Sequence, residues 1–286
     1  KELAAMKRID FANLFPQLNG GAYAQKEGSN YGGNNYKNDP ELGGKLTVTW
    51  ELDLWGNLRW AKDKSIAQFL GSIEAQRALK MSIVSEVAQA YFELVALDNE
   101  LNIVRQTLYA RKEGVRLAKL RFEGGLTSET SYQQAQVEYA RTATLVPELE
   151  RKISLKENDI AFLAGEYPHR IQRSILPEEV KLPETLGLPS TLLERRPDVR
   201  EAEQKLIAAN ASVGIAYTNM FPRLSLTAQY GVESEEFSDF FKSPIHYISG
   251  NLLTPLFAMG KYRATLKAKK AAYEQECYSY EKSVLT

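Results

Sequence analysis

The sequence predicts an α+β fold of long coiled-coil helical hairpins and β-hairpins, arranged as two copies of one unit. Three observations lead to this fold class. Residues 72–113 contain neither Gly nor Pro and repeat apolar side chains at helical spacing. Residues 45–55 alternate between polar and apolar side chains, as a half-buried strand does. A Phe-Pro-x-Leu pattern occurs twice, about two hundred residues apart, which indicates an internal duplication.

Both ends of the chain have a helical pattern. Leu3, Met6 and Ile9 recur at helical spacing, so we expect residues 1–13 to be the end of a helix that starts further upstream. Residues 259–286 form the start of another helix, which stops without a capping residue. We therefore expect a chain that is cut at both ends.

The first β-hairpin is expected over residues 14–55. Its clearest strand is Lys45 to Trp55, in which apolar residues occupy every second position: Leu46, Val48, Trp50, Leu52 and Leu54. The length of this segment matches the ~9–11 residues of a tilted transmembrane strand. On this segment alone, a half-buried strand of a soluble protein is the favoured interpretation.

The second β-hairpin is expected over residues 221–258. Its first strand alternates from Leu224 to Val232, whereas its partner, Ile245 to Phe257, is less regular and contains Pro255. The loops at Lys26–Gly44 and Val232–Pro244 are dense in Gly and Asn or in acidic and aromatic residues, so both are predicted to face solvent. The second loop carries the carboxylates Glu233, Glu235 and Glu236.

A long helical hairpin is predicted over residues 56–165. If Asn57 to Phe122 is one helix, it is roughly 100 Å long, a rod that favours a coiled coil over a single globular domain. Gly124 and Gly125 break the helix, and Thr127 or Ser128 is the N-cap candidate for the next one. That second helix is expected over residues 129–163, with a bend at Pro147.

Five prolines between residues 165 and 197 predict an irregular connector over residues 166–196. Pro197-Asp198 then opens a helix over residues 197–220, with proline at an N-terminal position. The nearby charges of Arg195, Arg196, Asp198 and Arg200 are better explained by helix capping and the helix dipole than by catalysis.

The duplication rests on two landmarks in the same order. LFPQLNGGAYAQ (Leu14 to Gln25) resembles MFPRLSLTAQYG (Met220 to Gly231). About forty residues after each copy, an x-Gly pair, Trp55-Gly56 or Met259-Gly260, leads into a helix. Because solenoid repeats are only ~20–50 residues long, an offset above two hundred indicates that a whole structural unit is duplicated.

Composition excludes several classes of protein. Thirty-six basic residues balance thirty-six acidic ones, so no electrostatic footprint for nucleic acid is present. One cysteine, Cys277, and two histidines, His169 and His246, leave little material for a disulfide framework or a metal site. There is no GxGxxG, Walker or HExxH motif and no apolar run of ~20 residues. We expect no catalytic residues, cofactor or metal.

The segment from Leu188 to Gly231 resembles the signature of the TolC-like outer-membrane efflux family, the outer membrane factors of tripartite efflux systems. Its core is Leu-x-x-Arg-Arg-Pro-Asp-Val-Arg-x-Ala-Glu, at Leu192 to Glu203, followed by an Ala-rich helix and Phe221-Pro222-x-Leu. Residues 52–56 (LDLWG) resemble the family's strand-to-helix junction, and residues 121–129 (RFEGGLTSE) resemble its periplasmic tip. The resemblance covers essentially the whole chain; most of a second helical hairpin is missing by comparison.

The resemblance implies a homotrimer in the outer membrane of a Gram-negative cell, extending into the periplasm. Each chain gives four strands to a shared transmembrane β-barrel and its helices to a periplasmic α-barrel tunnel. Such a channel is a passive conduit for efflux, often for multidrug resistance, and it docks a periplasmic adaptor protein and an inner-membrane pump. The tip residues Gly124, Gly125, Leu126, Thr127 and Ser128 would contact the adaptor; from the residues alone they are a glycine turn and a helix cap. Thr130-Ser131 stands where family tips often have Leu-Asp, so no carboxylate contact is expected there.

Strand arithmetic supports oligomerisation separately from the resemblance. Four strands cannot close a barrel, for which about eight is the practical minimum, and an open edge cannot lie in lipid. The main alternative is a soluble coiled-coil scaffold or tether with two β-hairpins, and an enzyme ranks third. The sequence does not identify the exported compound, the type of pump or a lipid anchor.

Overall fold

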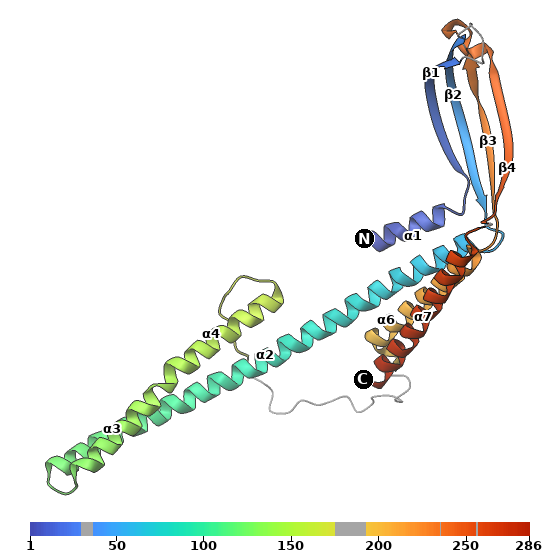
Figure 1. Cartoon of the computed structure of the whole chain (residues 1–286). Helices are drawn as coiled ribbons and strands as arrows, with labels where there is room; N and C mark the ends of the chain where they lie inside the picture. The colour runs from blue at the N-terminus through green and yellow to red at the C-terminus, as the bar shows by residue number, and fades with distance from the viewer. Residues whose placement is uncertain (30–36, 175–192, 235, 256) are drawn as a thin grey trace. The chain divides into compact units, whose positions relative to one another are not determined.

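The computed structural model describes residues 1–29, 37–174, 193–234, 236–255 and 257–286 (Figure 1). The chain divides into two compact units. One consists of Lys1–Arg77 together with Leu186–Thr286, and the other is Ala78–Thr185. The longest helix, α2 (Asn57–Glu123), contributes residues to both units.

The first unit contains a four-stranded antiparallel sheet, β1-β2-β3-β4 in sequence order (Figure 1). Its strands are β1 (Gln17–Ser29), β2 (Lys37–Leu52), β3 (Arg223–Ser234) and β4 (Pro244–Leu253). The two hairpins come from the two copies of the repeat and join through β2 and β3, where Leu42 pairs with Ser234 and Leu52 with Leu224. Within the described residues, β1 and β4 each have one strand neighbour and form the edges of the sheet.

Of the two predicted loops, Lys26–Gly44 proves to be largely strand, so that part of the sequence interpretation was wrong, whereas Val232–Pro244 is strand only at its two ends. β1 continues to Ser29, β2 begins at Lys37 and β3 continues to Ser234, while the short 3-10 helix η1 (Phe237–Lys242) lies in the second predicted loop. Glycine supports the extended β2 because the Tyr23 ring lies over Gly43. A Cβ at Gly43 would fall 2.3 Å from Tyr23 Cζ. An aromatic ring across the ladder thus covers a position that lacks its own side chain.

β2 ends at Leu52, three residues before the predicted end at Trp55. The chain leaves the sheet because the Asp53 carboxylate accepts hydrogen bonds from the backbone N–H groups of Leu58 and Arg59, both at 3.0 Å. These N–H groups belong to the first turn of α2, which has no partner for them within the helix. Gly56 makes the turn at φ 80°.

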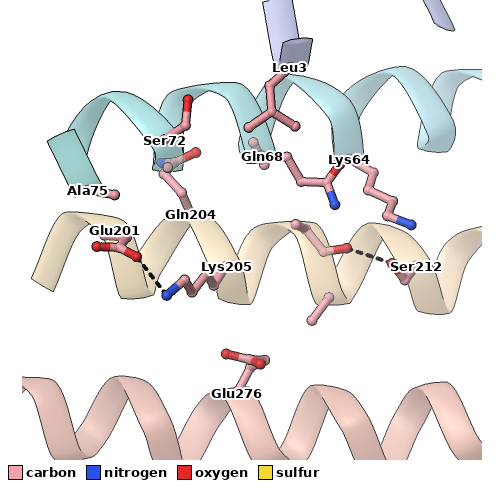
Figure 2. A pocket seen from close by; sticks show the side chains of 14 residues that line it. Leu3, Lys64, Gln68, Ser72, Ala75, Glu201, Gln204, Lys205, Ser212 and Glu276 are labelled. Atoms are coloured by element: carbon pink, nitrogen blue, oxygen red, sulfur yellow. Dashed lines mark hydrogen bonds and ion pairs between the residues drawn. The ribbon is translucent and has the colours of Figure 1, made fainter. Parts of the chain in front are cut away.

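The helices of the first unit are α1 (Glu2–Ala12), α6 (Pro197–Thr218), α7 (Met259–Leu285) and the first part of α2. α6 packs against α7 and against α2, where small buried residues allow close approach: Ala67 on α2, and Ala208, Ala211 and Ala216 on α6. Figure 2 shows α6 between α2 and α7, and Leu3 of α1 lines the same pocket as residues of these three helices.

The second unit is a helical hairpin built from the remainder of α2 with α3 (Glu129–Ala143) and α4 (Leu145–Ala164). Its core is a stripe of aliphatic side chains, among them Leu94 (0% exposed), Leu101, Leu149, Ile153 and Ile160. The predicted second helix is interrupted at Thr144, just before Pro147. Proline lacks the N–H that would bond to the carbonyl of residue i−4, here Ala143, so the helix breaks in the turn before it.

In the described part of the chain, none of the helices combines the length and apolar character that crossing a membrane requires.

Candidate partner-binding tip

The predicted tip residues form one continuous turn between α2 and α3. The Gly125 N–H donates to the Phe122 carbonyl at 2.9 Å and the Leu126 N–H donates to the Arg121 carbonyl at 2.8 Å. This pair of bonds is a Schellman motif, which places its C′ residue in the left-handed region, and Gly125 has φ 71°. The glycine break predicted from the sequence is therefore confirmed.

Leu126 follows Gly125 in this turn, and 79% of its surface is exposed. A Schellman motif usually packs the residue after its glycine against the last turn of the helix. Leu126 remains exposed instead, next to a glycine with no side chain. The turn thus presents one apolar side chain beside an accessible backbone, which suits contact with another protein.

Ser128 occupies the N-cap position of α3 with extended backbone angles (φ −72°, ψ 155°). It is one of the two residues, Thr127 and Ser128, that the sequence predicted for this position. Its hydroxyl makes no capping hydrogen bond, although its carbonyl accepts from the Ser131 N–H at 3.2 Å. Thr127 Oγ1 is buried and has no hydrogen-bond partner in the structure. The hydroxyl groups at this turn are therefore not committed to capping the helix.

Phe122, which lies in the tip-like segment 121–129, and Tyr132, which the sequence interpretation did not assign to the tip, hold the tip together. The rings of Phe122 and Tyr132 stack across the hairpin, with centroids 6.2 Å apart and planes 6° apart. Gln136 Nε2 donates to the Tyr132 hydroxyl at 2.6 Å. The available signal was an aromatic residue in the last turn of one helix and another in the first turn of the next.

The sheet has one polar and one apolar face. In β2, Lys45, Thr47, Thr49 and Glu51 share a face, and the register aligns them with Gly231, Gln229, Thr227 and Ser225 of β3. The opposite face carries large exposed apolar side chains: Leu18, Leu46, Val48, Trp50, Leu226, Tyr230, Ile248 and Leu252. An antiparallel sheet of a soluble domain buries its apolar face against a core, but this one is exposed over all four strands.

An ion-pair network in the second unit ties residues 171–174 to the hairpin. The Arg173 guanidinium bonds to Asp98 Oδ2 at 2.6 Å and to Glu157 Oε1 at 2.5 Å. The hydrogen bond to Asp98, followed by that to Glu157, raises the pKa of Arg173. The Ser174 N–H donates to the Tyr91 hydroxyl at 2.7 Å. These contacts border a polar cavity of 710 Å³, but because Arg173 satisfies both carboxylates, the network is best explained as structural.

The charges at the start of α6 form an ion pair, whereas Arg196, at the N-cap position, makes no side-chain capping hydrogen bond. Arg196 donates to Asp198 at 2.6 and 3.1 Å, and this hydrogen bond lowers the pKa of Asp198, assisted by the backbone N–H groups of Val199 and Asp198. Among the described residues, no group of three or more His, Cys, Asp or Glu side chains could hold a metal ion. The absence of catalytic residues and cofactors remains a prediction.

The chain belongs to the outer membrane efflux protein family, whose model matches residues 4–166 and 188–286. This assigns it to the outer membrane.

Known relatives agree with this assignment. The chain is 32% identical over 297 residues to the pyoverdine export outer membrane protein OpmQ of Pseudomonas aeruginosa, covering 100% of this chain and 62% of the relative. It is 35% identical over 248 residues to the outer membrane protein OprJ of the same organism, covering 83% and 50%. The crystal structure of the Campylobacter jejuni CmeC outer membrane channel superposes with a TM-score of 0.91 at 25% identity, covering 99% of this chain and 62% of that one. The chain thus spans about 62% of the length of OpmQ.

Proposed function

We propose that the chain is part of the outer-membrane channel component of a tripartite efflux or secretion system. The channel is a passive trimeric conduit from the periplasm to the exterior, and the energy for export comes from an inner-membrane pump. The family match supports the efflux role, and the names of OpmQ and CmeC describe an export protein and a channel. In this role the protein is not an enzyme. Its side chains line a pore through which the substrate passes unchanged.

The four-stranded sheet is the observation that carries the proposal. Its apolar face is exposed and its polar face is lined by hydroxyl, amide and charged side chains, which is the alternation of a transmembrane barrel with lipid outside and water inside. Among the described residues, the outer sides of edge strands β1 and β4 have no strand partner, and such open edges cannot lie in lipid. Since four strands cannot close a barrel and about eight is the minimum, several copies must pair edge to edge. Three copies give twelve strands.

The tip residues Gly124, Gly125, Leu126, Thr127 and Ser128 are proposed to contact a periplasmic adaptor protein. The exposed Leu126 supplies an apolar contact, and Gly125 allows the partner backbone to approach. Thr127 and Ser128 complete this contact segment at the start of α3.

We propose the following structural role for each segment of the chain. Residues 14–55 and 221–258 are the hairpins of the barrel, and residues 56–165 are the first helical hairpin of the periplasmic tunnel. Residues 166–196 form the connector, of which residues 175–192 lie outside the described part of the structure. The ranges 1–13, 197–220 and 259–286 are the helices that flank the two β-hairpins.

The decisive measurement is the native mass of the complete protein extracted from membranes in mild detergent. A trimer that dissociates on heating supports the channel, and ion conductance after reconstitution into a planar bilayer then tests the pore directly. A monomer that stays in solution without detergent would overturn the proposal in favour of a coiled-coil scaffold.

A further inference from the structure

The internal duplication extends further than its Phe-Pro landmarks. At an offset of 206, α1 aligns with α6: Ala5 with Ala211, Ile9 with Ile215, and Asn13 with Asn219 are identities. At an offset of 204, the start of α2 aligns with the start of α7. Arg59 and Arg263 are identical in this alignment, and Asn57 aligns with Lys261. The pair α2 and α6 therefore has a counterpart in the pair α7 and α1.

Within the chain, α2 and α6 are joined by Asn57. Its side-chain amide donates to Thr218 Oγ1 at 2.8 Å, to Asn219 Oδ1 at 3.0 Å and to the Ile215 carbonyl at 3.3 Å. Asn219 Oδ1 also accepts a bond from Arg223 at 2.6 Å, so this one oxygen has two donors. The amide thus fixes the start of one long helix against the end of another.

The counterpart site around Asn13 has one hydrogen-bond donor where the site around Asn219 has two. Gln17, which aligns with Arg223, donates to Asn13 Oδ1 at 3.3 Å, so one of the two donors is present. The second donor, the counterpart of Asn57, would be Lys261. Lys261 is exposed at the start of α7. Asn13 follows α1, which leads into edge strand β1, whereas Lys261 follows edge strand β4 at the other side of the sheet. The two residues therefore meet only if they belong to different copies of the chain.

Side-chain size supports the same pairing through a different set of residues. In the α2–α6 joint, Trp60 packs directly over Gly214; a Cβ at Gly214 would fall 2.5 Å from the indole ring. The aligned residues are Ala264 on α7 and Arg8 on α1, both exposed. In the first joint the large side chain is on α2 and the glycine is on α6. In the counterpart pair the large side chain, Arg8, is on α1 and the small one, Ala264, is on α7, so the two sizes again complement each other. Size complementarity at a helix crossing is a requirement of close packing.

We propose that a second copy of this chain docks the end of its α1 against the start of α7, with Lys261 donating hydrogen bonds to Asn13 Oδ1 and to the Ile9 carbonyl. Arg8 of that second copy packs over Ala264. The contact is heterologous, because one copy gives α7 and the other gives α1, and repetition of such a contact closes a ring. The contact rests on the oligomeric channel proposed above and specifies which residues join its subunits.

Thiol cross-linking in the complete protein tests the contact. In a Cys277→Ser background, Asn13→Cys with Lys261→Cys should give covalent dimers and trimers with a short bismaleimide. The matched pair Asn57→Cys with Asn219→Cys should react equally well yet stay at single-chain mass. As a negative control, Arg263→Cys replaces Lys261→Cys, because residue 263 lies about 200° around the helix from residue 261.

Two results would overturn the inference. One is an oligomer, shown by native mass in detergent, that yields no cross-linked species from positions 13 and 261; the other is equal yield with position 263. Both would leave the channel proposal standing, whereas a monomeric native mass would overturn the two together.

A charge exchange tests the same contact without cysteines. Lys261→Glu places a carboxylate against the Asn13 oxygen and should lower the temperature at which the oligomer dissociates in dodecyl sulfate. Asn13→Lys combined with Lys261→Glu restores an attractive pair and should recover the dissociation temperature. An unchanged temperature in Lys261→Glu would overturn the inference.

Discussion

Replacement of Gly125 by alanine tests the conformation of the tip. Gly125 has φ 71°, and an added Cβ would meet nothing within 4 Å, so the substitution strains the backbone without a steric clash. The left-handed conformation costs an L-residue about 1–2 kcal/mol. Because the Gly125 and Leu126 N–H groups make the two bonds of the Schellman motif, this energy should appear as easier opening of the turn.

The assay is amide hydrogen exchange of the peptide that covers residues 121–132. An increase of about 1–2 kcal/mol in the free energy of the closed turn corresponds to roughly 5–30-fold faster exchange. Gly125→Asn is the matched control, because asparagine tolerates the left-handed region. Gly125→Ala should also weaken adaptor binding in proportion. Unchanged exchange in Gly125→Ala, or equal acceleration in Gly125→Asn, would refute the backbone argument.

Three further predictions follow from separate parts of the structure. Leu126→Asp should weaken binding of the adaptor, measured by surface plasmon resonance, without lowering the melting temperature, because the side chain is 79% exposed; an equal loss from Leu117→Asp would show that the tip is not the contact. Leu94→Ala should destabilise the helical hairpin by about 2–5 kcal/mol in denaturant titrations, since Leu94 is fully buried; a change below about 1 kcal/mol would contradict the packing. The lowered pKa of Asp198 stabilises the fold above the unfolded pKa of about 3.9, and this contribution is lost as the pH falls through the lower folded pKa. Asp198→Asn should therefore flatten the pH dependence of the melting temperature below about pH 4, by a small amount because the side chain is half-exposed; an unaltered profile would assign the acid sensitivity to other groups.

Local patterns predicted the helices well. A 67-residue α2 follows from the absence of Gly and Pro over residues 72–113, and its end follows from Gly124 and Gly125. The start of α6 at Pro197 follows from the preference of proline for the first helical turn. The signals lie within a few residues of their effects, so they are visible in a single sequence.

The strands were predicted less completely. The alternation in residues 45–55 identified β2, but residues 37–44 are rich in glycine and lack a strand pattern of their own. They become strand because Tyr23, about twenty residues away, covers Gly43, and because β3 pairs with β2 at Gly43 and Gly44. Cross-strand partners of this kind do not appear in a local pattern.

The sequence by itself determined the turn at the tip, because glycine is the residue that readily takes φ 71° after a helix. It also determined the internal duplication, because matched landmarks recur in the same order along the chain. Tertiary structure alone decided that Phe122 stacks on Tyr132, that Ser128 makes no side-chain capping hydrogen bond and that Asn57 holds Asn219 from 162 positions away. These contacts depend on how far each helix turns before it meets its neighbour. That geometry is set by the packing of the whole unit and not by any one segment of it.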